Sequence, residues 1–116
     1  MNQTFDFGFG PVPAHRHQNG GGWVADSASV ADSAWVERNA QVFGNAEVCE
    51  NARICGEAKV FGEARVSGDA VVFGNAEVSG YAWVGGDAWV SGNAKVFGDA
   101  WVAGDAKVAG DAVISR

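Results

Sequence analysis

Cysteine, proline and long apolar runs are all scarce in this chain. It has 2 Cys and 2 Pro among 116 residues, which excludes a small disulfide-stapled scaffold and a proline-rich linker. No apolar run is long enough to cross a bilayer. The opening MNQTFDFGFG also lacks the basic and apolar segments of a signal peptide. We therefore expect a cytoplasmic protein that does not associate with membranes.

Cations are scarce as well. The sequence has 8 Lys and Arg against 14 Asp and Glu, for a net charge of -6. Nucleic acids and anionic membranes are bound by clustered Lys and Arg, so we expect neither as a partner. An acidic surface still permits a basic protein partner, or mimicry of an acidic one.

Histidine and threonine are almost missing. The two histidines, His15 and His17, both precede the repeat described below, and Thr4 is the single threonine. No Ser-His-Asp or Cys-His arrangement can therefore be assembled inside the repeat. The threonine array typical of a flat ice-binding surface is excluded too.

A period of six residues fills most of the chain. Val or Ile occupies every sixth position from Val24 to Ile114, and Ala every sixth position from Ala28 to Ala112. Gly fills eleven of the fifteen slots that begin at residue 26, and the next residue is nearly always Asn, Asp, Glu or Ser. A period of six is not helical, and residues two apart point to one side of an extended segment. Because Gly, Asn and Asp tolerate positive φ, each hexad predicts one short strand and one corner.

This pattern resembles the hexapeptide-repeat proteins, which form left-handed parallel β-helices, and the resemblance covers residues 23–116. It implies an all-β fold in which three hexads make one triangular coil, giving a prism of about five coils. Residues 1–22 would form a non-repeat N-terminal cap. The stretch GGGWVADSA, from Gly20 to Ala28, is similar to the opening of a bacterial and phage group in this family whose function is mostly unassigned.

In such a coil, residues eighteen apart stack, which places several aromatic side chains in columns outside the prism. Two interpretations are open: ladders that shield and stiffen the sheets, or an exposed apolar interface. We favour the interface. The resemblance implies a homo-oligomer, with a trimer expected first and a dimer second. The candidate interface residues are Phe43, Phe61, Phe97, Trp83, Trp101, Trp35, Trp89 and Phe73.

The first 22 residues depart from the repeat. Phe5, Phe7 and Phe9 alternate with small or polar residues, as in a half-buried strand. Together with Trp23, they are the candidate cap residues. We expect this segment to fold over the first coil as a lid, since the end of a β-helix otherwise leaves backbone unpaired. Exchange with a neighbouring subunit, or docking of a partner, are the alternatives.

Two groups are weak candidates for metal binding. Asp69, Asp87 and Asp105 form a corner column of oxygen ligands that Ca²⁺ would accept, although solvated turn carboxylates explain them better. His15 and His17 form a His-x-His pair that could bind Zn²⁺, although exposed or lid-packing histidines are the simpler interpretation. We expect no metal and no cofactor.

The sequence predicts a non-catalytic structural, assembly or protein-interaction module that self-associates through its outward aromatic faces. One alternative is an acidic binding protein that blocks a basic partner surface. The other is an enzyme, because the resemblance includes acyltransferases that use a His general base between subunits. Here only His15 or His17 could fill that role.

Overall fold

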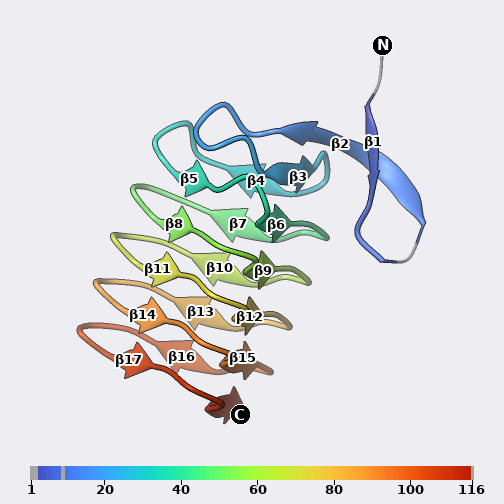
Figure 1. Cartoon of the computed structure of the whole chain (residues 1–116). Coiled ribbons are helices and arrows are strands. Elements are labelled where there is room, and N and C mark those ends of the chain that lie inside the picture. The colour runs from blue at the N-terminus through green and yellow to red at the C-terminus, as the bar shows by residue number, and fades with distance from the viewer. Residues whose placement is uncertain (1–2, 9, 116) are drawn as a thin grey trace.

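The computed structural model describes residues 3–8 and 10–115. Over these residues the chain is all-β, a stack of parallel coils that forms a β-solenoid of about five turns behind an N-terminal hairpin (Figure 1). The expected parallel β-helix is therefore confirmed.

Each turn of the solenoid has three sides, and each side is a parallel sheet. Side 1 contains β3 (Trp23–Ala25), β6 (Gln41–Val42), β9 (Lys59–Val60), β12 (Glu77–Val78), β15 (Lys95–Phe97) and β18 (Val113–Ser115). Side 2 contains β4 (Ser29–Val30), β7 (Glu47–Val48), β10 (Arg65–Val66), β13 (Trp83–Val84) and β16 (Trp101–Val102). Side 3 contains β5 (Trp35–Val36), β8 (Arg53–Ile54), β11 (Val71–Val72), β14 (Trp89–Val90) and β17 (Lys107–Val108).

The strands pair with a register of eighteen residues. Arg65 pairs with Glu47 on one side and with Trp83 on the other, and Trp83 pairs in turn with Trp101. The same spacing holds on the other two sides. The columns predicted from the hexad period are therefore the columns of the structure.

The core is the inward column of Val, Ile and Ala side chains. From Ala34 to Ala100 each of these is almost completely buried, and Ile54 is the largest. Burying one Val side chain contributes about 1.5–3 kcal/mol. The interior keeps one cross-section through successive coils because Val and Ala recur in the same two slots.

The corners depend on glycine where coils stack closely. Gly62 has φ +69°, and a Cβ there would lie 2.9 Å from the backbone nitrogen of Gly80. Glu50, at φ 59°, is a non-glycine residue in a corner slot with positive φ, and its Oε1 accepts a hydrogen bond from Gly68 N at 2.8 Å. At Gly62 the corner therefore combines a left-handed backbone with a close approach of the next coil. Glu50 shows that a side chain can occupy this slot when it hydrogen-bonds the backbone of the next coil.

The N-terminal segment caps the first coil in two parts. β1 (Thr4–Asp6) and β2 (Pro11–Arg16) form an antiparallel hairpin, and β2 pairs antiparallel with β3, so the hairpin extends side 1 (Figure 1). Residues 19–22 lie against the edge of β5, where Val36 N donates to Asn19 O at 3.1 Å and Gly22 N donates to Val36 O at 2.9 Å. Phe9 lies outside the described residues.

Candidate interaction surface

One group of outward aromatic side chains is covered by the chain itself. Phe7 of the hairpin stacks on Phe43, and Phe43 stacks on Phe61, each with ring centroids 4.8 Å apart. Phe5 stacks on Trp23 at the same distance. Phe43 is only 9% exposed and Phe61 is half-buried. Both residues, expected at an interface, here contribute to packing between the hairpin and side 1, because the antiparallel pairing of β2 with β3 brings Phe7 above them.

A second group is exposed. Trp101 is 65% exposed and Tyr81 is 63% exposed. The other four aromatic side chains of this group are each more than one third exposed. These four are Trp35, Trp83, Trp89 and Phe97. The sequence analysis missed Tyr81 because it occupies a corner slot. The signal that could have found it is an aromatic residue in a slot that holds Asn, Asp, Glu or Ser in all the other coils.

On side 2 the exposed aromatics form a pair. The Trp83 and Trp101 rings meet edge to face with centroids 4.7 Å apart, and Trp83 Nε1 donates to Ser67 Oγ at 3.2 Å. A small hollow of about 130 Å³ lies beside the two rings, and its floor includes Gly85 and Ala103. Small residues at these two positions leave both rings accessible from the side.

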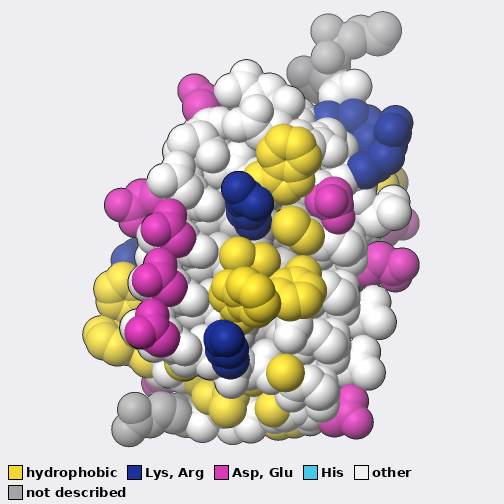
Figure 2. All heavy atoms as spheres, turned by 60° about the vertical axis from the view of Figure 1, so that its left-hand side comes forward, with side chains coloured by type: hydrophobic (Ala, Val, Ile, Leu, Met, Phe, Trp, Pro, Cys, Tyr) yellow, Lys and Arg dark blue, Asp and Glu magenta, His cyan; other side chains and the backbone are white. Residues whose placement is uncertain are grey.

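On side 3 aromatic and basic side chains share one column, with a valine at its centre. Phe73 packs edge-on against Trp89, with ring centroids 5.6 Å apart, and Lys107 Nζ lies 5.3 Å from the Trp89 ring centroid. Figure 2 shows this side, with hydrophobic and basic side chains in its middle, a row of acidic side chains along its left margin and further acidic side chains to the right. The column consists of Trp35, Arg53, Val71, Trp89 and Lys107.

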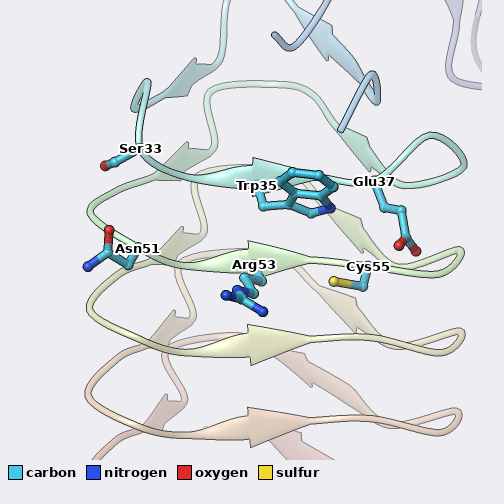
Figure 3. Close-up of a pocket in the computed structure, with 6 residues that line it drawn as sticks. All are labelled: Ser33, Trp35, Glu37, Asn51, Arg53 and Cys55. Atoms are coloured by element: carbon cyan, nitrogen blue, oxygen red, sulfur yellow. The ribbon is translucent and has the colours of Figure 1, made fainter. Parts of the chain in front are cut away.

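The upper part of side 3 is hollowed. The hollow has a volume of about 440 Å³ and is lined by Ser33, Trp35, Glu37, Asn51, Arg53 and Cys55 (Figure 3). Glu37 Oε1 accepts a hydrogen bond from Gly56 N at 2.7 Å, which holds this carboxylate at the wall of the hollow. The hollow therefore presents an indole ring, a guanidinium group and a fixed carboxylate together.

The two cysteines are free and half-buried. Cys55 follows β8 on side 3 and Cys49 follows β7 on side 2, so they lie on different sides. Burial raises the pKa of the Cys55 thiol, and the nearby Glu37 carboxylate raises it further. Burial also raises the pKa of Cys49, with contributions from Glu47 and Glu50. Both thiols are therefore less reactive at neutral pH than an unperturbed cysteine.

The predicted aspartate column lies at the corner between sides 2 and 3. Asp69, Asp87 and Asp105 are exposed and eighteen residues apart, and the backbone of Asp69 pairs with Gly86 of the next coil. Within residues 3–8 and 10–115, no three His, Cys, Asp or Glu side chains gather closely enough to hold a metal ion. The column forms an acidic margin to side 3.

The two histidines contact different parts of the first coil. His15 is exposed, and its Nδ1 donates to Asp26 Oδ1 at 2.7 Å. His17 is buried, and its Nε2 donates to Ala34 O at 2.8 Å. Each imidazole thus links the N-terminal segment to the solenoid.

Comparison with known proteins supports the repeat architecture. The family model described as YdcK beta solenoid repeat matches residues 64–80, which run from just before β10 to just after β12. No curated protein and no solved structure matches the chain. In the part of the chain that the structure describes, no helix has the length and apolar character needed to cross a bilayer. Over the matched coil, the chain is similar to a β-solenoid repeat.

Proposed function

We propose that this chain is a non-catalytic protein-interaction module that self-associates through the outward aromatic sides of its solenoid. The observation that carries the proposal is the exposure of Trp35, Trp83, Trp89, Phe97 and Trp101, each more than one third accessible. Aromatic residues are enriched in protein interfaces and account for much of their binding energy.

The scaffold favours such a role because it fixes the rings. Each exposed Trp belongs to a strand that pairs in parallel with at least one neighbour, and each column rests on a core of almost fully buried Val and Ala. Rings held on a rigid frame lose little conformational freedom when they are covered. Because the chain carries a net charge of -6, two copies repel at long range, and we expect added salt to strengthen their association.

The mass in solution tests the proposal. Light scattering over a concentration series should show a multiple of the chain mass for the wild type. It should show a lower mass for a variant that combines Trp35→Ser, Trp83→Ser, Trp89→Ser and Trp101→Ser. Glu63→Ser, at an exposed corner, is the matched control and should leave the mass unchanged. A wild type that stays monomeric at every concentration overturns the proposal.

The acidic column supports a second candidate function, the blocking of a basic partner surface. Residues 66–94 contain no Lys or Arg. Asp69 and Asp87 lie in this range and Asp105 follows it, and all three are exposed. Such binding should weaken steeply as salt increases, in the opposite direction to self-association. Titration with a basic protein at two salt concentrations distinguishes the two functions.

A further inference from the structure

The order of the outward residues in the side 3 column is self-complementary. β11 is the middle strand of this sheet, with two strands above it and two below. Outward from the central Val71, one direction meets Arg53 and then Trp35, and the other meets Trp89 and then Lys107. At each distance from Val71 there is therefore an aromatic ring in one direction and a cation in the other.

A twofold rotation about an axis parallel to β11 relates two copies so that each aromatic ring of one copy faces a cation of the other. When two copies of side 3 meet face to face with their solenoids antiparallel, Arg53 of each copy lies opposite Trp89 of the other. By the same rotation Trp35 lies opposite Lys107, and Val71 lies opposite itself. Cations over Trp rings attract, most strongly when the pair is removed from water.

The neighbouring outward column obeys the same symmetry. It contains the residues that follow each inward Val or Ile, namely Glu37, Cys55, Phe73, Ser91 and Ala109. The rotation places Phe73 opposite itself, Cys55 opposite Ser91, and Glu37 opposite Ala109. The large residues meet at the centre, and the remaining positions each have a small residue on at least one copy.

The shape of side 3 is complementary as well. The hollow of about 440 Å³ lies over β5 and β8, whereas the 46% exposed Trp89 stands on β14, below the centre. The rotation brings Trp89 and Lys107 of one copy to the hollow of the other. There the lysine approaches the carboxylate of Glu37, and the indole covers Arg53.

We propose that side 3 is a self-complementary interface through which two copies of this chain pair with antiparallel solenoids. The inference rests on the proposed function and specifies its interface, partner and orientation. Five strands spaced about 4.8 Å apart make a face roughly 20 Å tall, and the six residues of one side, at about 3.3 Å each, make it at most roughly 20 Å wide. Its area of roughly 400 Å² is about half of the 800 Å² or so that each partner buries in a standard interface. We therefore expect a dimer whose population depends on protein concentration. The rotation brings the acidic margins of the two copies together along the same edge of the interface, where they repel each other. Because added salt screens this repulsion, it should favour the dimer.

A disulfide cross-link tests the orientation. In a Cys49→Ser background, Ser91→Cys places a thiol opposite the second copy's Cys55. Within one chain these two positions are two strands apart, roughly 9.6 Å, which is too far for a disulfide. Mild oxidation at alkaline pH, where the raised pKa of Cys55 is reached, should give a covalent dimer. Peptide mapping should find position 55 joined to position 91.

The matched control is Ser79→Cys in the same background, which places a thiol on side 1 in the equivalent slot. It should give no cross-link to position 55. A disulfide that joins position 55 to itself, or no dimer from the Ser91→Cys protein, overturns the antiparallel arrangement.

An exchange of partners tests the complementarity. Arg53→Trp places two Trp rings opposite each other, and Trp89→Arg places two cations opposite each other, so each should weaken dimerisation about tenfold. The double variant restores a ring opposite a cation and should return the dissociation constant to within about threefold of the wild type. Circular dichroism confirms that each variant keeps its fold.

The outcomes separate this inference from the function on which it rests. If the wild type associates and both single variants associate equally well, the interface lies on another side. The proposed function then stands and the side 3 dimer is wrong. A wild-type assembly of three chains likewise overturns the twofold pair. A wild type that is monomeric throughout overturns both.

Discussion

Phe43 and Phe97 occupy the same slot of the repeat on the same side of the solenoid, yet their surroundings differ. Phe43 lies under the ring of Phe7 and on the ring of Phe61, and is 9% exposed. Phe97 follows a coil in which this slot holds Ser79, and is 39% exposed. The comparison shows that the repeat decides only that these side chains point outward. Whether they are buried depends on what the rest of the chain, or another chain, places over them.

The same contrast divides the molecule into two regions. In the upper region, the aromatic rings of Trp23, Phe43 and Phe61 pack with the hairpin. In the lower region, Trp89 and Trp101 are exposed on the outer surface. The upper rings show how an aromatic column on this scaffold is buried. The lower rings have no such cover within the described residues, and they belong to the surface that we propose a second copy contacts.

The largest expected effect is that of removing the hairpin ring. Phe7→Ala should lower the free energy of unfolding of the hairpin by about 3 kcal/mol, because it deletes a buried ring from the aromatic cluster. Hydrogen exchange measured by mass spectrometry should show faster exchange in β1 and β2.

Phe97→Ala is the matched control for Phe7→Ala. Because Phe97 is exposed, its truncation should change the free energy of unfolding by less than about 0.5 kcal/mol. Equal effects of the two substitutions would remove the distinction between covered and uncovered rings.

A smaller effect is expected at the corners. Gly62→Ala should lower the free energy of unfolding by about 2 kcal/mol, because its Cβ would meet the Gly80 backbone at 2.9 Å and its φ is positive. Gly104→Ala, with φ +67° but no atom within 4 Å of its Cβ, should lose only about 1 kcal/mol. Urea unfolding followed by circular dichroism compares the two. Identical losses would mean that backbone conformation alone, and not the close approach of coils, requires glycine.

The smallest effect is expected in the hollow of side 3. Glu37→Gln removes a negative charge that helps to raise the pKa of Cys55, while the amide oxygen can still accept the hydrogen bond from Gly56 N. A lower thiol pKa gives more thiolate at pH 7.5, so alkylation of Cys55 by iodoacetamide should become roughly twofold faster. Cys49 is the internal control, because the carboxylates that raise its pKa are Glu47 and Glu50. An unchanged ratio of the two rates contradicts this account.

Much of the solenoid could be predicted from the sequence because its order is local. The hexad period sets which residues point inward, and three hexads per turn set which residues stack, as the pairing of Arg65 with Trp83 shows. The covering of Phe43 could not be predicted in this way. It depends on the antiparallel pairing of β2 with β3, a contact between a non-repeat segment and the solenoid that no periodicity encodes.

The candidate site could be predicted only in part, because the repeat encodes the register of the outward residues but not what packs around them. The positions of Trp35, Trp83, Trp89 and Trp101 in their columns followed from the register. Their different exposures, and the hollow beside Arg53, depend on the sizes of neighbouring side chains and on how Trp35 packs under residues 19–22. His17 shows the limit most clearly, because it is buried against the first coil and donates a hydrogen bond to Ala34 O, a contact that the His-x-His motif does not encode.

The eighteen-residue register has a consequence for how such a chain can lengthen. Duplicating a single hexad would leave the interior intact, since every hexad supplies the same Val and Ala. It would nonetheless turn all later outward residues by one third of a revolution, and Trp89 and Lys107 would leave the side that carries Trp35 and Arg53. Only the gain or loss of whole coils keeps a pattern of outward residues on one side. An interaction surface on this solenoid should therefore tolerate insertions or deletions of eighteen residues far better than those of six.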